Sequence, residues 1–132
     1  MKKSIVIVGG VLILFGIILG AMGAHALKEV LTDKNMASFE TGVRYQMYMG
    51  LAILALGLNY SKFRKRSFKL FIGFILSGAI LFSLSIYGLV WADTVGASLK
   101  MVFGPITPLG GVLMIVGWLL FILQFFTHDD ET

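Results

Sequence analysis

The chain has 132 residues, enough for one domain, and 58% of them are hydrophobic while only 14% are charged. This composition, with a mean hydropathy of +0.91, excludes an ordinary soluble domain, because a fold of this size cannot bury so much apolar surface. The net charge of +4 comes without any recognised nucleic-acid-binding module, so we expect no nucleic-acid partner, and the absence of cysteine excludes disulfides and thiolate metal sites.

Residues 4–27 form the first predicted membrane span. Lys2, Lys3 and the small residues around His25 resemble the two ends of a secretory signal peptide. The uncharged run from Ser4 to Leu27, however, is longer than the ~7–15 apolar residues of a signal peptide and fits the ~20 residues of a membrane span. We therefore expect an uncleaved transmembrane helix.

Small residues recur along one side of this first helix. Gly16, Gly20 and Ala24 are spaced every four residues, with Gly23 beside them, and this pattern lets two helix backbones approach closely. His25 is expected on the opposite side, at the exit of the helix. A lone histidine there is either an interfacial hydrogen-bonding residue or part of a binding site.

The second predicted span covers residues 39–60 and follows a polar connection in which Thr32 or Asp33 is the expected helix cap. Its first turns, FETGVRYQMYMG, carry the least common residues of the chain. Glu40 and Arg44 stand four apart, so they share a helix face. The candidate polar cluster at this level of the membrane consists of His25, Glu40, Arg44, Tyr45 and Gln46.

Two interpretations of this cluster remain open from the sequence. In the first, Arg44 extends to the membrane surface or forms a structural ion pair with Glu40. In the second, Arg44 and Gln46 form an inward-facing site, since ionisable groups within a membrane often mark function. An arginine in such a site favours a carboxylate or another anionic group as its ligand.

A basic loop and the third predicted span, residues 68–91, come next. The positive-inside rule places this loop and both termini in the cytoplasm of a bacterial inner membrane. Anionic headgroups are the expected partner of the loop. Gly73, Ser77 and Gly78 offer a second close-packing face on the third span. The five basic residues are Lys62, Arg64, Lys65, Arg66 and Lys69.

The last predicted span covers residues 108–127. Thr107 as the helix cap, with Pro108 at the first helical position, is a favourable start for a helix. Residues 104–108 either lie flat on the membrane or dip back into it. The chain as a whole is thus predicted to be one all-α domain, residues 1–132, with four transmembrane helices.

Catalysis has the least support among the functions that the sequence allows. The chain contains no HExxH, no phosphate-binding glycine loop and no GxSxG motif. His25 and His128 are predicted at opposite faces of the membrane, so they cannot share a metal or a haem. We therefore expect no catalytic residues, no metal and no cofactor.

Three stretches of the sequence resemble the bacterial family catalogued as domain of unknown function 423, whose eukaryotic relative is transmembrane protein 256. The resemblance covers nearly the full length and implies a small four-helix inner-membrane protein, without implying an activity. Members of that family resemble YQMYHG where this chain has Met49 in place of the histidine, which argues against histidine-dependent chemistry at that position. The stretches are GAMGAHALK (20–28), TGVRYQMYMG (41–50) and GPITPLGGVLMIVGWLL (104–120).

Two functions follow from these features. The first is a non-enzymatic accessory or packing protein, either a homo-oligomer or a subunit of a larger membrane complex, because glycine-rich helices and short loops suit helix association. The alternative is a binder or carrier of a small anionic or amphiphilic molecule, held by the candidate polar cluster.

Overall fold

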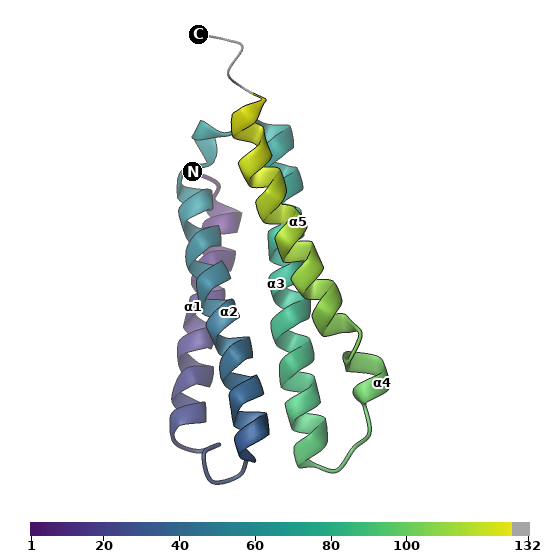
Figure 1. Cartoon of the computed structure of the whole chain (residues 1–132). Helices are drawn as coiled ribbons and strands as arrows, with labels where there is room; N and C mark the ends of the chain where they lie inside the picture. Colours follow the sequence, from purple (N-terminus) through teal and green to yellow (C-terminus); the bar gives the residue numbers. More distant parts are fainter. Residues whose placement is uncertain (128–132) are drawn as a thin grey trace.

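The computed structural model describes residues 1–127, and every regular element in this range is a helix. Four long helices form a bundle, and two short helical segments lie in the connections (Figure 1). The predicted all-α fold class is therefore confirmed. In chain order the elements are α1 (Lys3–Ala24), α2 (Asp33–Leu58), the 3-10 turn η1 (Tyr60–Lys62), α3 (Lys65–Thr94), α4 (Lys100–Phe103) and α5 (Ile106–Phe126).

The long helices run alternately up and down, so the connections lie at two ends of the molecule (Figure 1). One end, here called the basic end, holds the N-terminus, η1 and the last turn of α5. The other, here called the α4 end, holds α4 and the connection between α1 and α2. Lys2 fixes the N-terminus at the basic end, because its backbone N–H donates to the carbonyl of Gly57 at 2.8 Å and its ammonium lies 5.7 Å from the centroid of the Tyr60 ring.

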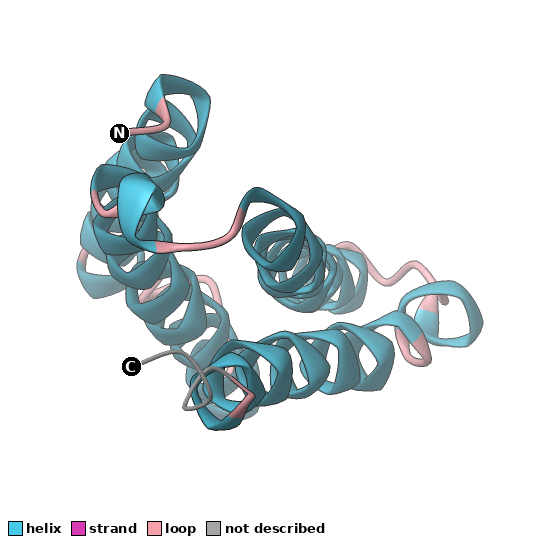
Figure 2. Ribbon diagram, turned by 90° about the horizontal axis from the view of Figure 1, so that it is seen from above, coloured by secondary structure: helices cyan, strands magenta, loops and turns pink. Residues whose placement is uncertain are grey.

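Each half of the chain forms a helix hairpin, and glycines let its two helix backbones approach closely. Helix α1 packs on α2, α5 packs on α3, and the two hairpins meet through α2 and α3, as the view from above shows (Figure 2). A Cβ added to Gly9 would lie 2.9 Å from the carbonyl oxygen of Gly50. In the second hairpin, a Cβ added to Gly110 would lie 2.8 Å from the carbonyl oxygen of Gly78. Only glycine permits the two backbones to come this close at each crossing.

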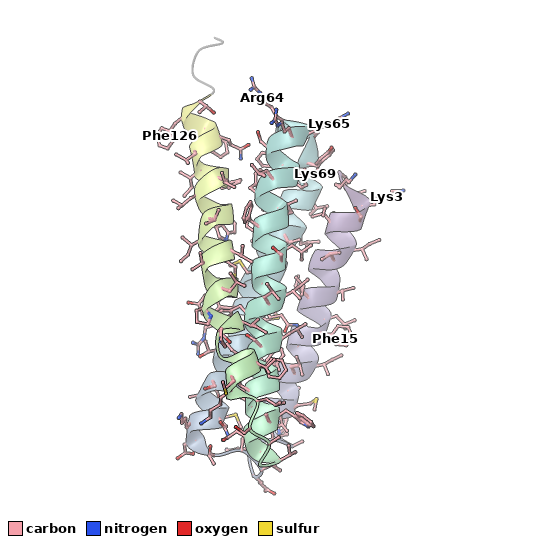
Figure 3. All side chains as sticks on the ribbon, turned by 90° about the vertical axis from the view of Figure 1, so that its right-hand side faces the viewer. Lys3, Phe15, Arg64, Lys65, Lys69 and Phe126 are labelled. Atoms are coloured by element: carbon pink, nitrogen blue, oxygen red, sulfur yellow. The ribbon has the colours of Figure 1, made fainter. Side chains whose placement is uncertain are left out.

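The largest apolar core lies between α2 and α3, toward the basic end. Ile53, Phe71 and Ile75 are fully buried there, and the ring of Phe121 from α5 meets the edge of Phe71 at 5.3 Å between centroids. Other large apolar side chains point outward, among them Phe15 of α1 and Phe126 of α5 (Figure 3). This distribution is typical of helices that face lipid.

Three helical stretches are long and apolar enough to cross a membrane: α1, α3 and the stretch Lys100–Phe126, which contains α4 and α5. Helix α2 is not among them in the part of the chain that the structure describes. Arg44 and Gln46 lower the hydropathy of its apolar half, which explains the difference. Four spans therefore stay a prediction, although α2 has 26 residues and is longer than α1 and α5.

Helix α2 begins earlier than the hydropathy of the sequence indicates. Residues 33–38, predicted as part of a polar connection, form its first turns. Of the two expected caps, Thr32 is the one that forms, since its hydroxyl accepts a hydrogen bond from the N–H of Asn35 at 3.2 Å. Capping chemistry, which does not depend on hydropathy, sets this boundary.

The predicted cap of α5 is wrong. The helix begins at Ile106 with Pro105 in the cap position, and the hydroxyl of Thr107 instead lies 2.5 Å from that of Ser85 on α3. Gly104 keeps right-handed helical angles (φ −55°, ψ −49°), so the chain passes from α4 into α5 with only a short interruption. A polar contact between helices has replaced the local cap.

Candidate functional site

The candidate polar cluster does not gather in one place. His25 follows the last residue of α1 and is exposed. Glu40 and Arg44, also exposed, line a groove of about 200 Å³ on the outer face of the α1–α2 hairpin, next to Gly20 and Gly23. The shared helix face of Glu40 and Arg44 thus exists, but it faces outward.

Tyr45 and Gln46 face other directions. Tyr45 packs on Phe82 of α3, with ring centroids 5.0 Å apart, and remains 39% exposed. Gln46 is buried inside the bundle. Consecutive helical residues are turned by ~100°, so Gln46 is turned by ~200° from Arg44 and the two side chains leave α2 on opposite sides.

Gln46 is the centre of a hydrogen-bonded contact between three helices. Its Nε2 donates to the carbonyl of Leu12 on α1 at 2.9 Å, and its Oε1 accepts from the hydroxyl of Tyr87 on α3 at 2.7 Å. Nearby, the hydroxyl of Ser83 donates to the carbonyl of Gly42 at 2.8 Å. Within residues 1–127 no buried side-chain nitrogen or oxygen lacks a partner. This network is therefore satisfied internally, which is what a structural contact requires.

A larger open cleft, with a mostly apolar lining and several polar side chains, lies at the α4 end. Its volume is about 680 Å³, and it is lined by the start of α2, the end of α3, α4 and the start of α5. Figure 1 shows α5 diverging from α3 toward this end, where α4 stands away from the bundle. We call it the α4 pocket. Its polar lining residues are Lys34, Asn35, Ser38, Thr41, Asp93, Lys100 and Thr107, and its apolar ones include Phe82, Ile86, Leu89 and Val90.

One hydrogen bond organises the polar side of the α4 pocket. Nδ2 of Asn35, a residue that is only 9% exposed, donates to Oδ2 of Asp93 at 2.6 Å and joins the start of α2 to the end of α3. Lys34 and Lys100 line the same pocket and are exposed. Two ammonium groups and one carboxylate leave an excess of one positive charge, so the pocket is suited to an anionic group.

The small residues expected to pack between helices have different surroundings. Gly16, Gly20 and Gly23 face α2, where a Cβ on each would meet a side chain of that helix. Ala24 is exposed at the end of α1, and Gly73 and Ser77 are exposed on the outer face of α3. The five basic loop residues are all exposed, and Figure 3 places Arg64, Lys65 and Lys69 at the basic end with Lys3.

No group of three or more histidine, aspartate or glutamate residues that could hold a metal ion occurs within residues 1–127. His128, predicted at the opposite face of the membrane from His25, lies outside this range. Met49, which stands where the resembled family has a histidine, accepts a hydrogen bond at its sulfur from the indole N–H of Trp118 at 3.4 Å. Its position is thus used for a contact between α2 and α5.

Comparison with known proteins places this architecture in a family. A family described as "protein of unknown function (DUF423)" matches residues 19–111. The chain belongs to this family. Relatives that match 92% of the chain agree with this assignment, so the family expected from the three sequence stretches is confirmed.

Relatives of this DUF423 protein occur in bacteria and in yeast. A "UPF0382 membrane protein" of Staphylococcus epidermidis is 36% identical over 92% of this chain and 93% of its own length. YwdK of Bacillus subtilis, also named a UPF0382 membrane protein, is 32% identical over 92% and 94%. A membrane protein of Schizosaccharomyces pombe with the same family name is 37% identical over 76% and 82%. No solved structure matches the chain significantly.

Proposed function

We propose that this DUF423 protein is a non-enzymatic membrane protein that binds a small amphiphilic molecule with an anionic group in the α4 pocket. The observation that carries the proposal is the pocket itself, which combines an apolar wall with two lysines and a fixed amide–carboxylate contact. Its volume of about 680 Å³ lies within the ~300–1,000 Å³ that is usual for small-molecule sites.

The lining divides the pocket into two chemical parts. Phe82, Ile86 and Val90 provide apolar surface on α3, toward the middle of the bundle. Lys34 and Lys100 stand at the polar end, where each ammonium can donate to an anionic oxygen. A molecule with a hydrocarbon part and an anionic head matches both parts, whereas a cationic head would meet two like charges.

The proposal includes a topology. We infer four spans in a bacterial inner membrane, with the basic end in the cytoplasm, because the positive-inside rule favours the side with Lys2, Lys3 and the basic loop. The α4 pocket then opens at the outer surface of the membrane. Trp91, which is 61% exposed near the end of α3, suits that interface. Labelling of single cysteines placed at residues 62 and 96 in intact cells tests the two sides, and an accessible residue 62 would contradict the topology.

Binding is tested with two probes that differ in the sign of their head. The purified full chain in a non-ionic detergent is titrated with laurate and with dodecylamine, and thermal unfolding is measured. Laurate should raise the unfolding temperature and dodecylamine should not. Replacing Lys34 and Lys100 together by glutamine should weaken laurate binding about tenfold or more, since hydrogen bonds to charged groups are strong.

The matched control for this experiment is the double replacement of Lys3 and Lys28 by glutamine, because these lysines are exposed and do not line the α4 pocket. It removes the same net charge and should leave laurate binding unchanged. Equal stabilisation by both probes, or equal loss of binding in the two double variants, would contradict the proposed site.

An accessory role is the second candidate, and two apolar grooves on the surface of the bundle favour it. One apolar groove of about 310 Å³ lies between α1 and α3, and another of about 430 Å³ lies between α2 and α5. A helix of a partner protein, or of a second copy, would gain packing contacts in either groove. Isolation in mild detergent tests this role: it requires a stoichiometric partner or a defined oligomer, and a strictly monomeric, partner-free chain would exclude it.

A further inference from the structure

A groove runs along the outer face of α3 from the basic end toward the middle of the helix, and it shares no lining residue with the α4 pocket. Its volume is about 510 Å³, and α5 contributes Leu113 to one wall. On α3 the lining residues follow one helical stripe, because they recur at i, i+3, i+4, i+7, i+8 and i+11. These residues are Arg66, Lys69, Leu70, Gly73, Phe74 and Ser77.

Gly73 leaves this groove open without serving the packing of the bundle. A Cβ added to Gly73 would meet no atom within 4 Å. By contrast, a Cβ added to Gly78 on the same helix would lie 2.7 Å from the carbonyl oxygen of Gly110. The absence of a side chain at Gly73 is therefore not required by any contact within the described part of the chain.

On the floor of the groove, the hydroxyl proton of Ser77 is already used within α3. The hydroxyl of Ser77 donates to the carbonyl of Gly73 at 2.7 Å and also lies 3.3 Å from the carbonyl of Phe74. A serine that bonds within its own helix presents mainly its carbon atoms outward. With Leu70, Phe74 and Leu113 as walls, the groove is chemically suited to a hydrocarbon chain.

The end of the groove is strongly cationic. Arg66 and Lys69 line it in the first turns of α3, and both side chains are exposed. Figure 3 shows Lys69 at the basic end with Arg64 and Lys65. The first turn of α3 has no side-chain cap and no acidic residue, so its free N–H groups add to the attraction for an anion.

We propose that this groove binds one acyl chain of an anionic phospholipid, with the phosphate held by Arg66 and Lys69. From Lys69 to Ser77 the helix rises ~12 Å, which is comparable with the ~15 Å depth of one leaflet's hydrocarbon. Two of the five basic residues thus belong to a defined site. Such a site differs from the uniform attraction of a basic loop to a charged membrane surface.

A second copy of the chain fits this groove less well than a lipid does. In a symmetric dimer formed through the same stripe with parallel α3 helices, Arg66 and Lys69 would face the same residues of the partner. These like charges repel each other. A phospholipid instead brings a negative charge to the two cations and hydrocarbon to the apolar walls.

The test compares a filled groove with an open one. The full chain is purified in detergent, and binding of phosphatidylglycerol and phosphatidylcholine is measured by native mass spectrometry over a range of lipid concentrations. Replacing Gly73 by leucine should reduce phosphatidylglycerol binding roughly tenfold, because the new side chain occupies the groove. Replacing Gly10 by leucine is the matched control, since a Cβ there also meets open space but lies on α1.

A second pair of variants tests whether lipid binding requires the charges of Arg66 and Lys69. Replacing Arg66 and Lys69 together by glutamine should remove the preference for phosphatidylglycerol over phosphatidylcholine, and replacing Lys62 and Lys65 together should keep it. Equal losses in the two double variants would show diffuse attraction and overturn the site. Unchanged phosphatidylglycerol binding in Gly73→Leu would also overturn it, as would conversion of a dimer into a monomer by that variant, because the groove would then hold a second copy.

Discussion

Gly73 and Gly78 lie on the same helix but have opposite surroundings. Gly78 faces α5, where the backbone of Gly110 leaves no space for a side chain, while Gly73 faces outward into an open groove. Arg44 and Gln46 form a second such pair on α2, one exposed and the other buried in a hydrogen-bonded contact between three helices. Residue type alone thus does not tell which positions hold the bundle together. The side of the helix on which a residue lies decides its role.

The largest effect is expected where two backbones touch. A leucine at position 78 would force α3 and α5 apart, since its Cβ would already lie 2.6 Å from the backbone nitrogen of Met114. We expect Gly78→Leu to lower the free energy of unfolding by ~3 kcal/mol or to prevent folding, because overpacking against backbone cannot be relieved by a change of rotamer. Gly73→Leu is the matched variant, with the same change in composition. Thermal unfolding in detergent measures both, and similar unfolding temperatures would contradict the comparison.

The Gln46 contact should give an intermediate effect. Gln46→Leu leaves the hydroxyl of Tyr87 without its acceptor and removes the link to α1, so we expect a loss of ~1–2 kcal/mol in the free energy of unfolding. Gln124→Leu is a suitable control, because within residues 1–127 the Gln124 side chain donates to the carbonyl of Phe121 in its own helix and joins no second helix. A double variant with Tyr87→Phe should cost less than the sum of the single changes. Strict additivity would show that the two side chains are not coupled.

The helices could be predicted from the sequence because long apolar runs in a small protein have few alternatives. The family could be predicted too, since the stretches around Gly20, Tyr45 and Pro108 resemble it together. The α4 pocket could not be predicted, because it depends on how the two hairpins meet. Asn35 and Asp93, which form its central hydrogen bond, are 58 positions apart, and both lie outside the predicted spans, Asn35 in the polar connection before the second and Asp93 just after the third. A local signal existed only at Thr32, whose capping role places Asn35 in the first turn of α2.

The dispersal of the candidate polar cluster, by contrast, could have been derived from helix geometry. Residues 44, 45 and 46 fan out over ~200° on a helix, so no single site can collect all three side chains from one face. Their closeness in the sequence indicates a functional cluster, but the rotation of the helix directs their side chains to different sides. What remains together is the pair Glu40 and Arg44, on the outer face of the first hairpin.

The smallest change in the free energy of unfolding is expected for Arg44→Leu. This variant also distinguishes the α4 pocket from the groove beside α1 as the place where the ligand binds. Arg44 is exposed and lines the groove beside α1, so Arg44→Leu should change the free energy of unfolding by no more than ~0.5 kcal/mol. Laurate binding should also be unchanged, because Arg44 does not line the α4 pocket. The same titration with Lys100→Gln gives the comparison, since that variant should bind laurate more weakly at equal stability. If Arg44→Leu instead abolished binding while Lys100→Gln kept it, the ligand would sit against α1 and α2, and the α4 pocket would not be the binding site.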